Sequence, residues 1–483
     1  MDLQSLTVRG LREKLDQKEL SAVEVASAYL SRISEKDPDI KSYITVCEES
    51  ALAQAKEAQK QIDSGNAKPL TGIPLGIKDN ICTEGVKTTC ASKMLADFVP
   101  PYNATVMQKL NDQNVVTLGK LNMDEFAMGG STATSYFKKT VNPFDFSKVP
   151  GGSSGGSAAC VSASLAPAAL GSDTGGSIRQ PSAFCGVTGL KPTYGAVSRF
   201  GLVAFASSLD QIGPIANNAY DCGLIFNQLC GFDPHDGTTS KHVHADALSL
   251  VGQSLKGLKI AVPKEFFEAG IDEEVKQSVY AAIKTYEEMG AQAVEVSMPS
   301  LKYAVPAYYL ISSAEASSNL SRYDGIKYGY RAQNGEDYND LIRRTRDEGF
   351  GTEVKRRILL GTYALASGYY DAYYKKALYL KGKIREEYNA IFDQCDVMIT
   401  PTAPSTALGF DEGISDPAKM YLADICTVTV NIAGLPAIST PCGYDKNGMP
   451  IGMSVVGRAF DEARLIQVAD AFEQGFERKI PTL

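Results

Sequence analysis

One lysine and two serines in glycine-rich segments have the types and spacing for nucleophilic catalysis without histidine. Lys78 ends the apolar run Gly72-Ile-Pro-Leu-Gly-Ile-Lys78, where a charged side chain is costly unless it is paired or used. Ser153 lies in Gly-Gly-Ser-Ser-Gly-Gly, and Ser177 ends the segment Asp173-Thr-Gly-Gly-Ser177. A serine nucleophile needs a base, and a neutral lysine is the available kind. These residues therefore indicate acyl transfer through a serine.

The glycine-rich segments fit a phosphate-binding loop or a histidine-dependent hydrolase less well. A phosphate-binding P-loop requires a lysine directly after its last glycine, and neither run has one. The run also contains the G-x-S-x-G pattern of an α/β-hydrolase elbow, but that fold needs a histidine after the serine. His235, His242 and His244 begin in a loop-like Asp-Pro-His-Asp-Gly segment, so we expect them at the surface. Lysine is the remaining candidate for the base.

Short runs rich in β-branched residues alternate with helical patterns, which predicts a layered α/β fold. The expected strands are Leu75–Ile77, Val115–Leu118, Ile260–Val262, Ala293–Val296, Val397–Thr400 and Ile451–Val456, and the expected helices include 272–289 and 461–475.

The region before the catalytic segments is predicted to be helical over residues 5–63. Its apolar side chains recur at helical spacing, and Ser21-Ala-Val-Glu24 fits a capping box. A second, tyrosine-rich helical region covers about 300–390. There we expect the stripe of Tyr363, Tyr370 and Tyr374 to pack between helices rather than to stack on a ligand.

The composition limits the possible partners and compartments. The 483-residue chain carries a net charge of -8. This charge argues against the chain as the main nucleic-acid-binding component, because phosphate binding needs clustered Lys and Arg. No apolar run is long enough for a signal or a membrane span. The ten cysteines are scattered and predict reduced, buried side chains. We therefore expect a cytoplasmic protein with no membrane association and no bound metal.

Taken together, the lysine and the two serine segments resemble the amidase signature family. The resemblance covers nearly the whole chain and implies one amidase domain over 1–483. That domain would have a helical segment at 1–65, a catalytic core at 66–216 and a helical substrate-side region at about 300–390. The implied fold is a central mixed β-sheet covered by helices on both faces.

The resemblance also implies roles for individual residues. Ser177 is the expected nucleophile, Ser153 relays its proton, and Lys78 is the terminal base. Since a free lysine has a pKa near 10.4, burial must lower the pKa of Lys78 for this role. In this family the serine that matches Ser153 follows a cis peptide bond. The backbone N–H groups of Thr174, Gly175, Gly176 and Ser177 are the expected oxyanion hole.

Within the family, further stretches are most similar to the glutamine-hydrolysing A subunits of tRNA-dependent amidotransferases. These stretches are Lys78-Asp-Asn-Ile-Cys-Thr83, Thr88-Thr-Cys-Ala-Ser-Lys93, Asn122-Met-Asp-Glu-Phe-Ala-Met-Gly-Gly-Ser131 and Gly368-Tyr-Tyr-Asp-Ala-Tyr-Tyr374. Ala133 departs from a Ser-Thr-Glu pattern that is usual there.

For such a subunit the substrate is glutamine, which carries both a carboxylate and an ammonium. The resemblance implies that Arg357 binds the carboxylate, Asp424 binds the ammonium and Tyr308 lines the pocket. The alternative for Arg357 is a solvated helix face, since it ends the run Lys355-Arg-Arg357.

The implied assembly is a heterotrimer with subunits B and C. A partner would use the released ammonia to amidate Glu-tRNA(Gln) or Asp-tRNA(Asn), with ATP and Mg²⁺ at the partner and no cofactor in this chain. Charged tRNA would be contacted mainly through the partner. Two alternatives stay open: a stand-alone amidase for small or apolar amides, and a structural subunit without activity.

Overall fold

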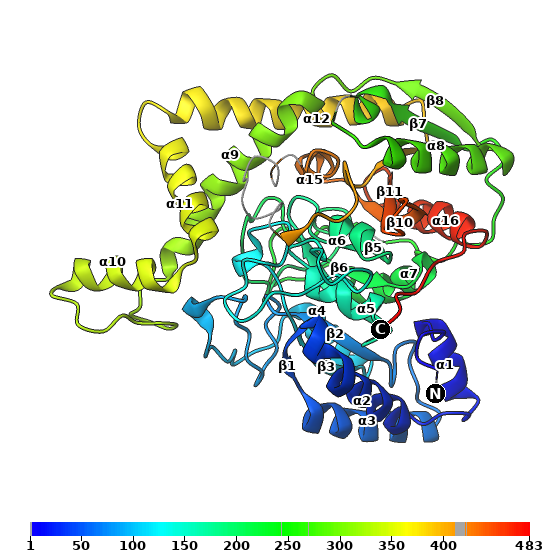
Figure 1. The fold of residues 1–483 in the computed structure, drawn as a ribbon, viewed down its shortest axis with the longest axis horizontal. Helices are drawn as coiled ribbons and strands as arrows, with labels where there is room; N and C mark the ends of the chain where they lie inside the picture. The colour runs from blue at the N-terminus through cyan, green and yellow to red at the C-terminus, as the bar shows by residue number, and fades with distance from the viewer. Residues whose placement is uncertain (1, 243, 269, 411–420, 422) are drawn as a thin grey trace.

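An eleven-stranded mixed β-sheet forms the centre of the computed structural model, which describes residues 2–242, 244–268, 270–410, 421 and 423–483 (Figure 1). The strand order is β1-β3-β2-β4-β6-β5-β10-β11-β9-β7-β8. The strands are β1 (Tyr43–Val46), β2 (Pro74–Lys78), β3 (Val116–Leu121), β4 (Ala168–Asp173), β5 (Thr188–Lys191), β6 (Gln211–Ala216), β7 (Lys259–Pro263), β8 (Gln292–Val296), β9 (Val397–Pro401), β10 (Ala437–Tyr444) and β11 (Pro450–Val456).

The described helices surround this sheet. They are α1 (Val8–Asp16), α2 (Ala22–Ile40), α3 (Glu48–Asp63), α4 (Thr105–Asp112), α5 (Gly155–Ser162), α6 (Arg179–Phe184), α7 (Ala219–Leu229), α8 (Glu273–Glu288), α9 (Leu301–Asn319), α10 (Tyr338–Gly349), α11 (Thr352–Leu365), α12 (Lys375–Phe392), α15 (Val428–Ala433) and α16 (Glu462–Glu473). Short helical turns lie at Lys93–Leu95, Glu125–Ala127, Lys264–Phe267, Leu320–Arg322 and Tyr370–Tyr374.

Helices cover both faces of the sheet, as two neighbouring residues of β5 illustrate. The Thr188 hydroxyl donates to Glu473 of α16 at 2.6 Å. Gly189, which faces the other way, packs directly against Ser182 of α6. Because successive strand residues point to opposite faces, α16 and α6 lie on opposite sides of the sheet. The expected α/β fold with a covered mixed sheet is confirmed.

The catalytic segments lie in the first half of the sheet. Strand β2 runs parallel to β3 and β4, and β4 pairs antiparallel with β6. All five residues of β2 are buried, as are all six of β4. Both strands are therefore central, and the residues at their carboxyl ends, Lys78 and Asp173, point into one region of the protein interior.

The N-terminal region is helical as expected, with one interruption by β1. The capping box is confirmed: the Ser21 hydroxyl accepts from the Glu24 N–H, and the Glu24 carboxylate accepts from the Ser21 N–H at 2.8 Å. Strand β1 pairs antiparallel with β3 at the edge of the sheet. The sequence did not predict this strand. Its four residues are too few to show an alternating pattern.

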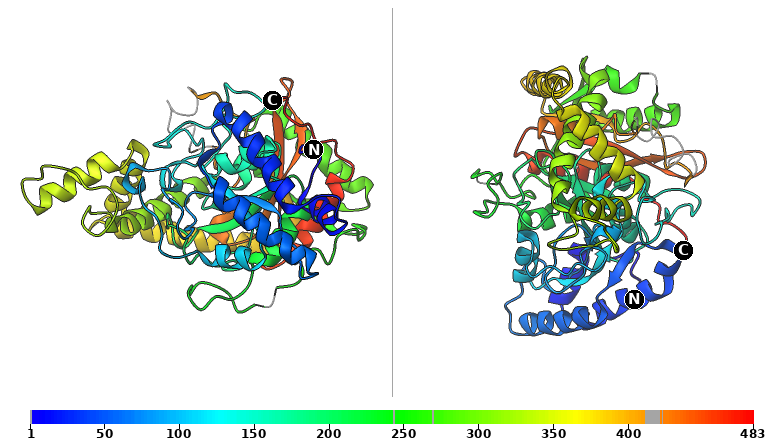
Figure 2. Two further views of the ribbon diagram at one scale, coloured as in Figure 1. Left: turned by 90° about the horizontal axis from the view of Figure 1, so that it is seen from below. Right: turned by 90° about the vertical axis from the view of Figure 1, so that its left-hand side faces the viewer.

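The tyrosine-rich region forms a helical layer from which α10 projects (Figures 1 and 2). The expectation that its tyrosine stripe packs between helices is wrong. Tyr363 is 47% exposed, Tyr370 is 39% exposed, and none of Tyr370–Tyr374 is buried. The opposite face of α11, with Val354, Gly361 and Ala364, is the one that packs inward, so the tyrosines are left at the surface.

Helices α9 and α11 cross at Gly361, and this contact gives a test of the helical layer. A methyl group at Gly361 would overlap the backbone carbonyl of Ser313 on α9. We predict that Gly361→Ala lowers the free energy of unfolding by about 1–3 kcal/mol, because a well-packed contact must open. Thermal unfolding measures this change.

Gly382 in α12 is the matched control, because a methyl group there meets no atom within 4 Å. Gly382→Ala should raise stability by about 0.5–1 kcal/mol through helix propensity. Equal melting temperatures for the two variants would contradict the close packing of α9 on α11.

Candidate active site

Lys78 ends β2 with its side chain buried among hydroxyl groups. Its Nζ lies 2.8 Å from Ser153 Oγ, 2.8 Å from Ser154 Oγ and 2.9 Å from Ser172 Oγ. The Ser172 carbonyl oxygen is 3.2 Å away. Among the described residues no carboxylate pairs with this lysine, so hydroxyl and carbonyl oxygens are its hydrogen-bonding partners.

The hydroxyls around Lys78 have further hydrogen-bonding partners of their own. The Ser154 hydroxyl donates to the Ser172 carbonyl at 3.0 Å, so it accepts from the lysine. The Ser172 hydroxyl accepts from the Asn80 side-chain amide at 2.9 Å. A neutral amine has two N–H donors and one lone pair. If the neutral amine directs its two donors to Ser154 and Ser172, its lone pair is left for Ser153.

Burial lowers the pKa of Lys78 to about 7, against the opposing effect of Asp124, Asp173 and Asp210. A pKa near 7 means that a large fraction of the lysine is neutral at physiological pH. This is the property that a general base requires.

The loops that carry the two serines are in direct contact. The peptide bond between Gly152 and Ser153 is cis. The Gly152 N–H donates to the Gln180 side chain at 2.9 Å, and the Ser154 N–H donates to the Ser177 carbonyl at 3.2 Å. Ser177 itself is 8% exposed, so its side chain lies at the border of the protein interior.

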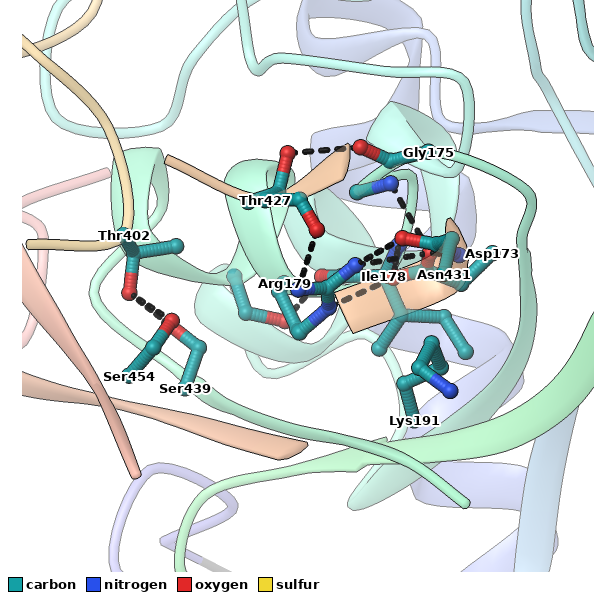
Figure 3. A network of polar contacts seen from close by, with 12 residues as sticks. Asp173, Gly175, Ile178, Arg179, Lys191, Thr402, Thr427, Asn431, Ser439 and Ser454 are labelled. Carbon is teal, nitrogen blue, oxygen red and sulfur yellow. Dashed lines mark hydrogen bonds and ion pairs between the residues drawn. The ribbon is translucent and has the colours of Figure 1, made fainter. Parts of the chain in front are cut away.

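An ion pair that sequence reasoning missed holds the Ser177 loop (Figure 3). Arg179 binds Asp173 through Nε and Nη2, at 3.0 and 3.1 Å, and both side chains are fully buried. Asp173 also accepts from the N–H groups of Gly176 and Ile178 and from the Asn431 side chain. Burial opposes the charge, but Arg179 keeps the pKa of Asp173 well below its usual range. The signal for this ion pair in the sequence was the presence of an aspartate and an arginine in the one segment Asp173-Thr-Gly-Gly-Ser-Ile-Arg179.

Arg179 further connects this loop to the segment before α15. It donates to the Thr427 carbonyl at 3.1 Å, and the Thr427 hydroxyl donates to the Gly175 carbonyl at 2.6 Å (Figure 3). Backbone carbonyls and N–H groups of the loop are thus fixed from two sides.

The expected oxyanion donors are partly engaged. The Gly176 N–H donates to Asp173 at 2.8 Å, so it is not free for a ligand. The N–H groups of Thr174, Gly175 and Ser177 have no acceptor in the described part of the chain. A side chain at Gly175 would overlap the ring of Tyr308. Glycine is therefore needed for this aromatic ring to lie directly on the loop.

Tyr308 and its neighbour Tyr309 connect the loop to the two expected charged residues. Both lie on α9 with their rings at 81° and 5.0 Å between centroids. The Tyr309 hydroxyl donates to Asp424 at 2.6 Å. The Arg357 guanidinium lies over the Tyr309 ring at 4.5 Å from its centroid. The structure thus brings Tyr308, Arg357 and Asp424 together.

Arg357 is 2% exposed, so the alternative of a solvated helix face is wrong. Its Nε donates to Glu353 at 2.6 Å, and Glu353 also accepts from Tyr421 at 3.1 Å. Sequence reasoning missed Glu353, although its spacing of four residues before Arg357 on a helix was a readable signal. This carboxylate orients the guanidinium.

Burial raises the pKa of Asp424 to about 6, while the Tyr309 hydroxyl and Arg357 oppose the shift. Asp424 therefore remains largely ionised near pH 7 and supplies a negative charge next to a positive one. A cation and an anion beside one aromatic pair match the two charged groups of an α-amino acid.

Other chemically reactive groups lie apart from this site. His242 is exposed and stacks on Phe460, and the His235 side chain is 65% exposed. The cysteines are free thiols, most of them buried. In the described residues no group of His, Cys, Asp and Glu is arranged to hold a metal ion, and no helix is long and apolar enough to cross a bilayer.

Comparisons with known proteins agree on one family. The family model described as Amidase matches residues 24–466. A protein of Ruminiclostridium cellulolyticum, named as the A subunit of glutamyl-tRNA(Gln) amidotransferase, is 59% identical over 99% of both chains. The crystal structure of the subunit of that name from Thermotoga maritima is 41% identical, with a TM-score of 0.82, over 100% of this chain and 98% of that one. The peptide amidase of Stenotrophomonas maltophilia is 28% identical with a TM-score of 0.83, over 99% and 98%. The buried lysine, the paired serine loops and these full-length matches establish that the chain belongs to the amidase family.

Proposed function

We propose that the chain is the glutamine-hydrolysing subunit of a tRNA-dependent amidotransferase. The observation that carries the proposal is the placement of Arg357 and Asp424 around Tyr309, beside Tyr308 and the Gly175 loop. A simple apolar amide needs neither charge. Glutamine needs both charges, because it carries a carboxylate and an ammonium. These groups lie at the opposite end of the molecule from the amide that reaches the serine loop.

In the proposed reaction, Ser177 Oγ attacks the amide carbon of glutamine. Its proton passes to Ser153, and the Ser153 proton passes to the neutral Lys78, whose Nζ lies 2.8 Å from Ser153 Oγ. The N–H groups of Thr174, Gly175 and Ser177 are the donors available to the developing oxyanion. When the tetrahedral intermediate collapses, the C–N bond breaks and the nitrogen leaves as ammonia with a proton returned from Lys78 through Ser153. Water then hydrolyses the glutamyl ester on Ser177.

The charged residues act on the other end of the substrate. Arg357, oriented by Glu353, binds the α-carboxylate, and Asp424 binds the α-ammonium. Both side chains are held by protein groups, Arg357 by the Glu353 carboxylate and Asp424 by the Tyr309 hydroxyl, so their positions are fixed before substrate binds. Remote binding energy of this kind positions the reacting amide.

The ammonia is passed to a partner that amidates Glu-tRNA(Gln) or Asp-tRNA(Asn). Several relatives are named as the A subunit of glutamyl-tRNA(Gln) amidotransferase, which supports an assembly with further subunits. We assign these as subunits B and C, with charged tRNA, ATP and Mg²⁺ bound mainly by the partner. The Lys-Ser-Ser reaction needs no cofactor in this chain. We assign the assembly to the cytoplasm, where charged tRNA is used.

The lysine base gives a pH prediction. Lys78 must be neutral to accept a proton, so the acylation rate should fall as the pH drops through about 7 and level off above it.

Ser177→Ala should abolish acyl-enzyme formation. Lys78→Ala should reduce kcat by about 10²–10⁴ with little change in the melting temperature. Single-turnover glutamine hydrolysis between pH 5.5 and 9 measures these effects.

Lys191 provides a matched control. It is also buried with its pKa lowered to about 7, but it donates to the Pro192 carbonyl rather than to a serine. Lys191→Met should still show the fall in acylation rate as the pH drops through about 7. If this fall persisted in Lys78→Ala and vanished in Lys191→Met, the assignment of the base would be wrong.

Asp424 gives a second prediction, on substrate affinity. Its ionised form binds the ammonium, so KM for glutamine should rise as the pH drops through about 6. Asp424→Asn keeps an acceptor for Tyr309 but removes the charge. It should raise KM for glutamine at least about tenfold, since hydrogen bonds to charged groups contribute about 1.5–3 kcal/mol. The rate with a small neutral amide should stay at the wild-type value, and a parallel loss with both substrates would argue against ammonium binding.

The assembly is tested by isolating the tagged chain from its own cells. We predict co-purifying subunits and release of ammonia from glutamine that rises when ATP and Glu-tRNA are added. A lone chain that ignores glutamine and cleaves simple apolar amides would instead identify a stand-alone amidase.

A further inference from the structure

Glu125 is a buried carboxylate that the proposed reaction does not use. It is 4% exposed. One oxygen accepts from the Ser92 hydroxyl at 2.5 Å, and the other accepts from the Gly351 N–H at 2.8 Å. In the described part of the chain it forms no ion pair. Burying a carboxylate without a cation is costly, and these two hydrogen bonds stabilise Glu125 in its buried position.

We propose that Glu125 is a positioning residue that fixes helix α11, and with it the Arg357 guanidinium, relative to the Lys78-Ser153-Ser177 centre. The inference rests on the proposed function, because it gives Glu125 a role in binding the glutamine carboxylate. Contacts on both sides of Glu125, toward the substrate residues and toward the proton relay, support this role.

On the substrate side, Glu125 holds the first turn of α11. Gly351 is the N-cap of that helix, and its N–H points at the carboxylate. The Glu125 oxygen occupies the space where a side chain of residue 351 would lie. A negative charge at a helix N-terminus is also favoured by the helix dipole. Arg357 lies on this same helix, so the contact sets where its guanidinium stands.

On the catalytic side, the neighbouring residue Asp124 is joined to the serine loop. Its N–H donates to the Ser153 carbonyl at 3.3 Å. Its carboxylate accepts from the Ser131 N–H at 3.1 Å and occupies the space where a side chain of residue 152 would lie. Two adjacent residues therefore connect the proton relay to the helix that binds the substrate carboxylate.

The segment has a second anchor that keeps it in place without the Glu125 carboxylate. The ring of Phe126 packs against Phe350 and Tyr323, at 5.7 and 5.1 Å between centroids. Removing the carboxylate leaves these aromatic contacts in place, so Phe350 stays anchored, and only the first turn of α11 that follows it loses its contact with residue 125. A shift of this helix misplaces Arg357 without moving Lys78 or Ser153.

The test compares Glu125→Ala, Glu125→Gln and wild type in the chain assembled with its partner subunits. Two quantities are measured: KM and kcat for glutamine, and labelling of Ser177 by a small neutral fluorophosphonate, with glutamine as protecting ligand. We expect Glu125→Ala to raise KM for glutamine by about 10–100-fold, the range for misplacement of a substrate-binding group. The glutamine concentration needed to protect Ser177 from labelling should rise by the same factor. Labelling without glutamine should stay within about twofold of wild type. Glu125→Gln, which still accepts from Gly351, should restore most of the affinity.

Glu473 is the matched control, because it is another carboxylate held by hydroxyls and one backbone N–H, those of Thr188, Thr440 and Ala219. Burial raises the pKa of Glu125 and of Glu473 to about 7. Glu473→Gln should leave KM unchanged. The inference would be overturned if Glu125→Ala had the KM of the wild type, or if it lost labelling without glutamine as strongly as it lost affinity for glutamine. If glutamine did not protect Ser177 of the wild-type protein from labelling, the proposed function would be overturned as well.

Discussion

The buried ion pair between Asp173 and Arg179 determines the geometry of the whole site. It closes the turn after β4, so the chain reverses tightly between the strand and α6, with Ser177 on the turn. The same carboxylate accepts from two backbone N–H groups of that turn, and the same guanidinium reaches Thr427 and Asn431. A buried pair of this kind leaves an uncompensated charge when one partner is lost, at a cost of about 3–5 kcal/mol. The pair is therefore a structural element, and the nucleophile loop depends on it.

Around this pair, the site separates two tasks. The proposed proton relay is built from the end of β2, the loop before α5 and the turn after β4, and hydroxyl groups rather than carboxylates are hydrogen-bonded to its lysine. In the proposed function, the charged residues for the substrate lie on α11 and in the segment before α15, neither of which is part of the sheet. Separation has a physical reason: a carboxylate beside Lys78 would favour the charged amine and raise its pKa. The acidic residue that we propose for the substrate ammonium, Asp424, accordingly pairs with Tyr309 and not with Lys78.

The sequence was most informative where chemistry constrains a few adjacent residues. The glycine-serine runs and Lys78 could be singled out, and the strands with β-branched residues were placed correctly, as β7, β9 and β11 show. Strand β4 was missed because Ala168–Asp173 is made of small residues with little β-propensity. Strand β6 was missed because it contains Gly213 and Pro214. Contacts such as that of Tyr309 with Asp424 join distant parts of the chain, and no local pattern reports them.

The order of the strands has a consequence for how the enzyme is made. Strands β10 and β11 are among the last segments of the chain, yet they lie in the middle of the sheet, between β5 and β9. Among the described strands, β10 and β11 are what join the part of the sheet with β2 and β4 to the part with β7, β8 and β9. Asp424, Thr427 and Asn431 come from the same late region. A growing chain on the ribosome thus holds the reactive lysine and serines long before it holds a closed site. The topology thus allows the candidate site to be completed only when synthesis of the polypeptide is almost finished.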